Sequence, residues 1–394
     1  MAFSTESLAG RGALIVGHAA GMLDLVAAPL WIGVLIQYRH LSPFEAGILM
    51  TTYTAGVFLT SIALAPRFSS LRPQLIAAVG FLLGAVAFGA IIRLDGFAAL
   101  MPAHFVAGIG AGSALSMVHG TISRSARPHR LFAFANIGVA LFSIVFFIAV
   151  PQFVQRDPNT VFFVLGGLLV AASLAAAVMF PQPPAQPASN VRTVTGASEA
   201  PYWPAVILAF AGVALMSVGQ SEIYPFLERI GAWRGFPEAS IANVLAVSGV
   251  LNLLAPIAAA LLENVVPRVL TISIALAVHA VFTVTASSSP QFLLYAVAGS
   301  LLIFMTIFSH TFMFGVISKL DTSGRTASST PAMITLGAMI GPALGGAVAQ
   351  YVGYSAIGWV SAVVLLASSA CFFVIGSFRL ASLQRGNIYD AKMT

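Results

Sequence analysis

The chain has 394 residues, of which 59% are hydrophobic and only 8% are charged, and its formal net charge is +6. Soluble domains carry about 25% charged residues, so this composition excludes a soluble globular protein and indicates a polytopic α-helical membrane protein. The single cysteine, Cys371, excludes a disulfide bond within the chain.

The first apolar segment, 11–37, carries an acid in its middle. The segment is long enough to cross a bilayer, for which about 20 residues suffice, yet it contains Asp24 and, before it, His18. A charge at the bilayer centre costs roughly 2.5–3.5 kcal/mol on insertion scales, and no nearby basic residue in the segment could neutralise Asp24. We therefore expect Asp24 to face protein or a water-filled cavity. Its carboxyl is either a functional group or a hydrogen-bonded one with a structural role only.

Apolar runs between Pro, Gly and charged residues predict twelve membrane-spanning helices. The long polar connection 181–203, rich in Pro, Ala and Ser, is typical of a flexible linker. We predict an N-terminal six-helix bundle over 1–180, a cytoplasmic linker over 181–203, and a C-terminal six-helix bundle with a short tail over 204–394. The twelve segments lie near 11–37, 43–66, 74–93, 96–120, 131–154, 159–180, 204–227, 238–262, 268–286, 291–318, 327–351 and 355–377.

The basic residues predict the orientation. With both termini in the cytoplasm, thirteen of the 18 Lys and Arg residues fall on the inner side and five on the outer side, as the positive-inside rule requires. This distribution explains the positive net charge without nucleic acid. We expect a multi-pass, monomeric protein of a bacterial-type inner (plasma) membrane with both termini cytoplasmic.

The two halves repeat each other weakly. At an offset of 195 residues, HGTISRSARPHR (119–130) aligns with FGVISKLDTSGR (314–325), and at an offset of 193 the segment after Glu45 aligns with the segment after Glu238. These matches place helix 4 over helix 10 and helix 1 over helix 7. Two six-helix halves repeated in the same orientation are the layout of major facilitator superfamily transporters.

A glycine motif strengthens this resemblance. The run GAMIGPALGG (337–346) matches the GxxxGPxxGG motif of that superfamily, here in helix 11. Such glycines let helix backbones approach closely and a proline allows a bend, so the motif serves either packing and gating or direct substrate contact. The sequence is therefore similar to a twelve-helix transporter of this superfamily over essentially its whole length. The motif residues are Gly337, Gly341, Pro342, Gly345 and Gly346.

The resemblance implies a cavity lined mainly by helices 1, 4, 7 and 10, and the ionisable residues agree with it. Six of the seven that lie inside apolar segments fall on these helices, and His279 on helix 9, which we interpret as structural, is the exception. We expect a proton-coupling path centred on Asp24, with Glu222 or His104 as the relay, and a substrate cavity that includes Gln220, Tyr224 and Trp31. The proposed path comprises Asp24, Glu222, His104, His18, His119 and His310.

These residues predict secondary active transport of a small organic solute by alternating access, coupled to protons. No Lys or Arg lies deep in a cavity helix, which favours a neutral, amphipathic or cationic solute, or a weak acid carried with its proton. Efflux by proton antiport and uptake by proton symport remain open, as does transport of a metal or metal chelate, because His and carboxylates are metal ligands. The sequence has no GxxxxGK[ST] or HExxH motif, so we expect neither an enzyme nor a cofactor or resident metal. A non-transporting receptor is the remaining alternative.

Overall fold

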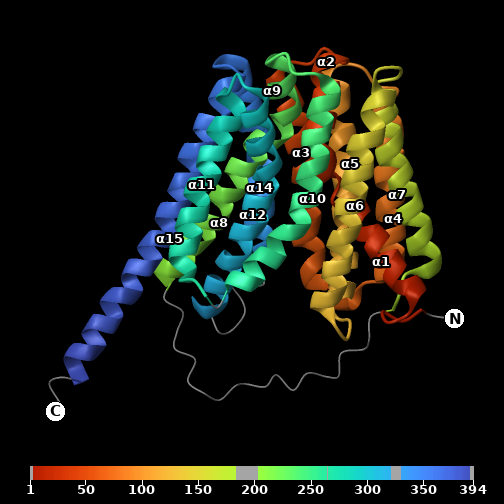
Figure 1. Ribbon diagram of the computed structural model, residues 1–394. Coiled ribbons are helices and arrows are strands. Elements are labelled where there is room, and N and C mark those ends of the chain that lie inside the picture. Colours follow the sequence, from red (N-terminus) through yellow and green to blue (C-terminus); the bar gives the residue numbers. More distant parts are fainter. Residues whose placement is uncertain (1–2, 183–202, 264, 321–329, 391–394) are drawn as a thin grey trace.

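The computed structural model describes residues 3–182, 203–263, 265–320 and 330–390, without the side chains of 23–25, 65, 129, 318–319, 330–331 and 378–390. Every regular element in this part is a helix, and twelve segments are long and apolar enough to cross a membrane (Figure 1). The predicted all-α class and twelve spans are thus confirmed. Most of the expected linker, 183–202, lies outside the described residues.

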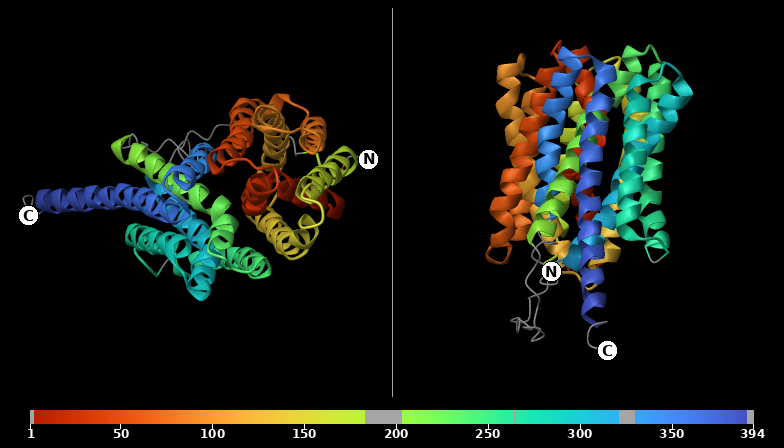
Figure 2. Two further views of the ribbon diagram at one scale, coloured as in Figure 1. Left: turned by 90° about the horizontal axis from the view of Figure 1, so that it is seen from above. Right: turned by 90° about the vertical axis from the view of Figure 1, so that its left-hand side faces the viewer.

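The N-terminal half consists of α1 (Leu8–Gly21), α2 (Leu23–Gln37), α3 (Pro43–Leu64), η1 (Ala65–Ser70), α4 (Pro73–Ile91), α5 (Phe97–Ser123), α6 (Pro128–Val154) and α7 (Thr160–Met179). The C-terminal half consists of α8 (Trp203–Ile223), η2 (Tyr224–Phe226), α9 (Leu227–Trp233), α10 (Glu238–Leu262), α11 (Arg268–Ser288), α12 (Phe292–Leu320), α14 (Thr330–Tyr351) and α15 (Tyr354–Asp390). Viewed along the helices, the two halves lie side by side (Figure 2). Both chain ends lie at the lower end of the bundle in Figure 1. We call this end of the bundle the terminal end, and we call the opposite end the far end.

The first membrane segment of each half is interrupted. The predicted span 11–37 is confirmed as one membrane-crossing segment, Leu8–Gln37, which consists of two helices because Met22 adopts φ −106° and ψ 29° between α1 and α2. Gly21, just before this break, packs so tightly that a Cβ there would lie 2.6 Å from Leu115 of α5. In the second half Pro225 lies in the 3-10 turn η2 between α8 and α9. Interrupted helices in both repeats are typical of transporter binding sites.

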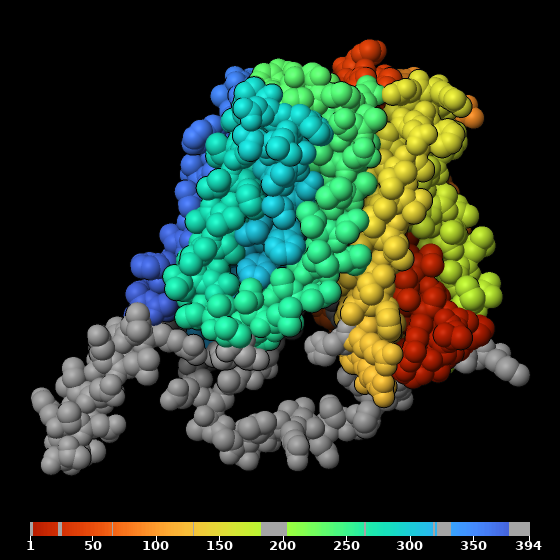
Figure 3. Space-filling view, in the orientation of Figure 1, coloured from red at the N-terminus to blue at the C-terminus, as the bar shows by residue number. Residues whose placement is uncertain are grey.

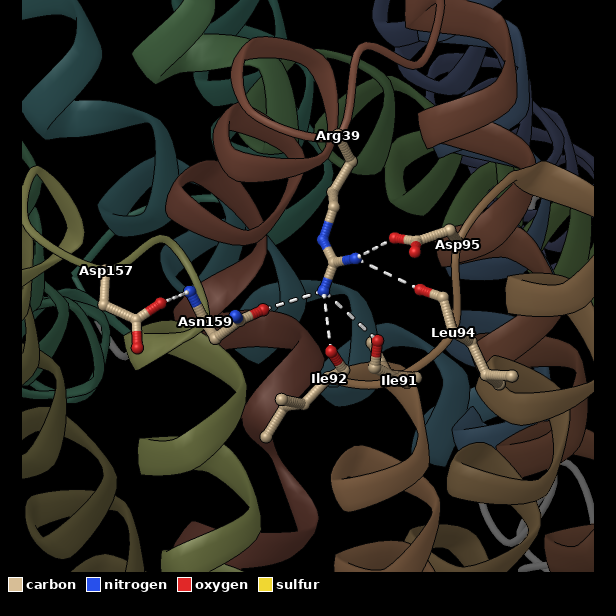
Figure 4. A network of polar contacts seen from close by, with 7 residues as sticks. All are labelled: Arg39, Ile91, Ile92, Leu94, Asp95, Asp157 and Asn159. Atoms are coloured by element: carbon tan, nitrogen blue, oxygen red, sulfur yellow. Dashed lines mark hydrogen bonds and ion pairs between the residues drawn. The ribbon is translucent and has the colours of Figure 1, made fainter.

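An arginine fixes the far end of each half. Arg39, in the loop after α2, donates to the carbonyls that end α4 and to a side chain at the start of α7, so it holds three elements together (Figure 4). Arg234, 195 residues later, donates to the carbonyls of Ser287 and Ser288 at the end of α11. The partners of Arg39 are Leu94 O at 3.1 Å, Asp95 Oδ1 at 2.8 Å, Ile91 O at 3.3 Å, Ile92 O at 3.4 Å and Asn159 Oδ1 at 2.7 Å.

The residue after each arginine has a positive φ. His40 has φ 53° and Gly235 has φ 78°, so both loops make the same left-handed step, which glycine adopts freely and other residues rarely. The repeat between the halves therefore includes the arginine and the left-handed residue after it, which we call the Arg corner. Its offset of 195 residues is the one that aligns α5 with α12, the fourth and tenth spans. The sequence contained this signal, and our sequence reasoning missed it.

The two halves meet along α3 with α14, α6 with α10, and α2 with η2 and α9. Among the described residues, the hydrogen bonds that join the halves lie in the part of the bundle nearer the far end. Toward the terminal end the surfaces of α6 and α10 separate (Figure 3). The structure is therefore closed between the halves at the far end.

Candidate functional site

A small cavity of about 50 Å³ lies where the two halves meet. Elements of both halves contribute to it, and the interrupted helices α2 and α8–η2 face each other across it. Its lining residues carry no charged side chain. They are Ala28 of α2, Met50 and Thr54 of α3, Gln220 and Ser221 of α8, Tyr224 and Pro225 of η2, and Ala338 and Pro342 of α14.

Gln220 places an unpaired amide at the lining of this cavity. The residue is only 4% exposed, and neither its amide nitrogen nor its amide oxygen has a hydrogen-bond partner in the protein. A buried polar group without a partner costs about 1–3 kcal/mol, and a bound solute with one acceptor and one donor would remove that cost. Tyr224, also 4% exposed, lies one turn further along. The sequence predicted both residues at the cavity and missed Met50 and Thr54.

The backbone of Asp24 lies one helical turn from this cavity. It is the second residue of α2, and Ala28, which lines the cavity, is four residues later. Residues four apart share one face of a helix, so the Asp24 position is on the cavity face of α2, next to the break at Met22. Its side chain lies outside the described residues, and its central role stays a prediction.

The glycine motif of α14 lies at close helix contacts. A Cβ on Gly337 would lie 2.5 Å from Ala214 O, and one on Gly341 would lie 2.6 Å from Ser221 C. Gly345 lies against the Glu222 carbonyl, so three glycines spaced by four residues pack α14 onto α8. Gly346 faces the other way, against Pro43 and Phe44 of α3. The same motif therefore packs α14 within its own half and across to the other half.

Thr51 joins α3 to α14 beside Pro342. Its hydroxyl donates to Met339 O at 2.8 Å and accepts from Ala343 N–H at 3.1 Å. These two backbone groups are four residues apart in α14, the spacing of a helical hydrogen bond, so the hydroxyl of one half bridges a turn of the other half. A proline at Pro342 weakens the ladder of α14 at this point. The contact has to break whenever the halves separate at the far end.

Three further hydrogen bonds close the far end between the halves. Arg229 Nη1 donates to Gln37 Oε1 at 2.6 Å, and Gln155 Nε2 donates to Glu238 Oε2 at 2.6 Å. The amide of Phe44 donates to Gln350 Oε1 at 3.2 Å. All are side-chain contacts that can exchange for water, so the closure is reversible by small movements.

His18 and His119 form a pair in the N-terminal half. The two rings approach to 2.9 Å between His18 Nδ1 and His119 Nε2, and Asn136 Oδ1 lies 3.5 Å from the other nitrogen of His18. One ring must donate and the other accept, so the pair shares a proton between α1 and α5. Phe132 packs edge-on against both rings. Neither histidine lines the cavity between the halves.

His104 and Trp31 lie inside the N-terminal half and away from the cavity. Trp31 Nε1 donates to His104 Nε2 at 3.3 Å, and His104 Nδ1 lies 2.8 Å from Leu100 O. The ring accepts at one nitrogen and donates at the other, which is the pattern of a neutral imidazole. Both residues are 0% exposed, and Trp31 packs against Tyr53 and Phe88. This arrangement fits a structural pair.

Glu222 and His310 lie within the C-terminal half. Glu222 is 0% exposed, and neither carboxyl oxygen has a hydrogen-bond partner in the protein. His310 on α12 is 9% exposed and stacks on Phe314. The structure thus separates the six predicted coupling residues into the Asp24 position near the cavity, a histidine pair and the Trp31-bonded His104 in the N-terminal half, and two buried groups in the C-terminal half. Within the described residues, no three His, Cys, Asp or Glu side chains come together as a metal site.

Comparison with known proteins gives the fold. No family model matches the sequence, and no curated protein matches it. Among solved structures, a bacterial homolog of the human lysosomal transporter Spinster, in an inward-facing and occupied conformation, covers 93% of this chain and 96% of its own with a TM-score of 0.73 at 13% identity. A mutant of the nucleoside transporter NupG covers 94% of this chain and all of its own, with a TM-score of 0.71 at 12% identity. The chain has the major facilitator fold. The resemblance drawn from the sequence is thereby confirmed at the level of the fold.

Proposed function

We propose that the chain is a secondary active transporter that moves a small uncharged solute across a membrane by alternating access. The observation that carries this proposal is the cavity between the two halves, in which Gln220 offers an unpaired amide donor and acceptor. A site shared by two halves that are joined at one end by breakable side-chain contacts can be presented to each side in turn. In the predicted orientation the far end is outside, so the structure corresponds to an inward-facing state.

The lining of the cavity favours an uncharged polar or amphipathic solute. A charged solute in such an apolar place needs an ionic partner, and the described lining offers only amide, hydroxyl and phenol groups beside aliphatic ones. One structural neighbour is a nucleoside transporter, and a nucleoside is an uncharged molecule with hydrogen-bond donors and acceptors. A nucleoside is therefore the first solute to test.

Proton coupling through Asp24 is the second part of the proposal. The Asp24 position lies four residues before Ala28 of the cavity lining in α2, and a carboxyl on that face of the helix would make solute binding and protonation depend on each other. Neutralising it by Asp24→Asn would leave exchange of solute intact and abolish its dependence on a pH gradient. An inward proton gradient that drives accumulation would indicate symport, and one that drives depletion would indicate antiport.

Counterflow in proteoliposomes tests the solute site without requiring proton movement. Liposomes loaded with unlabelled nucleoside take up labelled nucleoside through the wild-type protein, and a lipophilic cation and a weak organic acid serve as the competing solute classes. Gln220→Leu lowers the rate about 5- to 150-fold, because the loss of a buried hydrogen-bond pair costs about 1–3 kcal/mol. Gln152→Leu is the matched control, since Gln152 is exposed on α6 and bonds only to Ile148 O of its own helix. Equal counterflow in the Gln220 variant and wild type would contradict the site.

A further inference from the structure

Buried polar side chains without partners gather inside the C-terminal half. The helices α8, α15, α11 and α12 contact one another in that order and α12 contacts α8 again, so they form a closed ring. Each of the four helices contributes polar atoms that are buried and have no hydrogen-bond partner in the protein. These atoms belong to Glu222 of α8, Ser361 of α15, Ser273 and His279 of α11, and Ser309 and His310 of α12.

Contacts between the helices place these groups in one interior. Thr283 Oγ1 donates to Gly358 O at 3.0 Å, which sets α11 against α15. His279 and Ser361 lie about one turn from this contact, in the same direction, since the two helices are antiparallel. The Ser361 hydroxyl lies beside the Glu222 carboxyl without making a hydrogen bond of normal geometry with it. The helices that carry His279 and His310, α11 and α12, pack against each other.

The groups also follow one another along the membrane normal. At roughly 1.5 Å per residue, Ser361 lies about 10 Å from the far end of α15, and His279 lies about 14 Å from that of α11. By the same measure Ser273 lies about 22 Å deep, and Ser309 and His310 lie about 26 Å from the far end of α12. Steps of about 4–8 Å separate neighbouring levels, which water molecules or rotamer changes can bridge.

We infer that these residues form a proton path of the C-terminal half, which leads from the terminal end through His310 and His279 to Glu222 and is separate from the solute cavity between the halves. A buried carboxylate without a partner is too costly to persist in an apolar interior, whereas the protonated carboxyl is tolerated. A proton that reaches His310 moves along imidazole, hydroxyl and water groups, and the last transfer forms the O–H bond of Glu222. The inference deepens the proposed function and rests on it.

Other groups packed against this ring do not compete for the role. On α8 and η2 the neighbouring titratable side chain is Tyr224, which faces the cavity, and Cys371 of α15 lies beside Gly212. At the far end, Glu228 and Arg229 are on α9 and Arg234 follows it; Arg229 bonds to Gln37, and Arg234 bonds to the end of α11. On the ring helices, Tyr295 of α12 donates to Leu227 O, and Arg268 of α11 pairs with Glu263. Tyr351, at the far end of α14, is exposed.

Infrared difference spectroscopy after a rapid drop from alkaline pH, at which the Glu222 carboxyl is ionised, to neutral pH tests the path on the full-length protein in nanodiscs, without any solute. Wild type should show the carbonyl band of a newly protonated carboxyl, and Glu222→Gln should remove it. His279→Phe and His310→Phe, which keep the ring volume but cannot carry a proton, should each slow the appearance of the band at least tenfold. Their unfolding temperatures are measured in parallel, and His279→Gln replaces His279→Phe if that variant does not fold. His40→Asn, which changes an exposed histidine at the far end, is the matched control and should leave the rate unchanged.

The outcomes separate the inference from the function. The proton path would be overturned if Glu222→Gln left the spectrum unchanged. It would also be overturned if the band appeared at the wild-type rate in folded variants of both His279 and His310. Absence of nucleoside counterflow in wild type would overturn the proposed solute class and leave this measurement intact. A purely structural role of the histidines would change the unfolding temperature and not the rate.

Discussion

Replacing Gly47 by alanine should force the two halves apart at the far end. Gly47 lies in the first part of α3 and faces α14 of the other half. A Cβ at this position would collide with the carbonyl oxygen of Pro342 and would lie 3.0 Å from its carbonyl carbon. Carbon atoms pack at about 3.5–4.0 Å, so α3 and α14 would have to separate by roughly 0.5–1 Å. The opposing atoms are backbone atoms and cannot rotate away.

The magnitude follows from the cost of overpacking. Inserting a methyl group into a well-packed contact costs about 1–3 kcal/mol, and here the cost falls only on the state in which the far end is closed. Since about 1.4 kcal/mol corresponds to a tenfold change in an equilibrium constant, the population open at the far end should rise about 5- to 150-fold. Gly346→Ala should act in the same direction, because Gly346 lies against Pro43 and Phe44 across the same boundary.

Distances between spin labels report this shift. Labels at Arg93→Cys and Gln291→Cys, in a Cys371→Ala background, mark exposed loops at the far end of each half. Gly47→Ala should add a longer distance that wild type populates weakly. Gly167→Ala is the matched control, since a Cβ there would meet nothing within 4 Å. A distance distribution identical to wild type in a folded Gly47→Ala protein would refute the reasoning.

Three other substitutions test the contacts that shape the halves. Arg39→Ala should lower the free energy of unfolding by about 2–3 kcal/mol, because charge-assisted hydrogen bonds that join α2, α4 and α7 are lost. Asp95→Asn should lower it by less than about 1 kcal/mol, since that carboxylate is 91% exposed. Thermal unfolding of the two variants measures the difference. Thr51→Val should raise the far-open population in the spin-label experiment about fivefold, as expected for the loss of roughly 1 kcal/mol, and an unchanged distribution would contradict the role of its bridge to α14. His104→Phe should cost about 1–3 kcal/mol of stability, because it leaves the Trp31 indole N–H without its acceptor, and a variant as stable as wild type would speak against a structural pair.

The spans of the fold could be predicted because hydropathy sets them. Twelve apolar runs become twelve spans, and Pro225 breaks the first helix of the second half because it lacks an N–H. The break at Met22 could not be read in this way. It lies beside the close approach of Gly21 to Leu115, a contact between helices that lie far apart in the sequence. The Arg39 and Arg234 corners could have been predicted from their common offset of 195 residues, because a repeat between the halves extends into the loops.

The candidate site was only partly predictable for a related reason. Gln220 and Tyr224 could be found because polar side chains in an apolar run are costly, and both line the cavity. Sequence gives the depth of a residue along a helix but not the direction in which the helix face points. For this reason Trp31 and His104, on the expected cavity helices, lie inside the N-terminal half. His279, interpreted as structural from its helix number alone, lies in the polar interior of the C-terminal half.

The central claim is that solute movement through the cavity between the halves is coupled to protonation of Asp24. The most direct test adds solute to one side of proteoliposomes that contain a pH-sensitive dye, with wild type, Asp24→Asn and Gln220→Leu prepared in parallel. The account predicts a solute-dependent pH change with wild type, none with Asp24→Asn despite intact counterflow, and loss of both signals with Gln220→Leu. A solute-driven pH change that persists in both variants would contradict it.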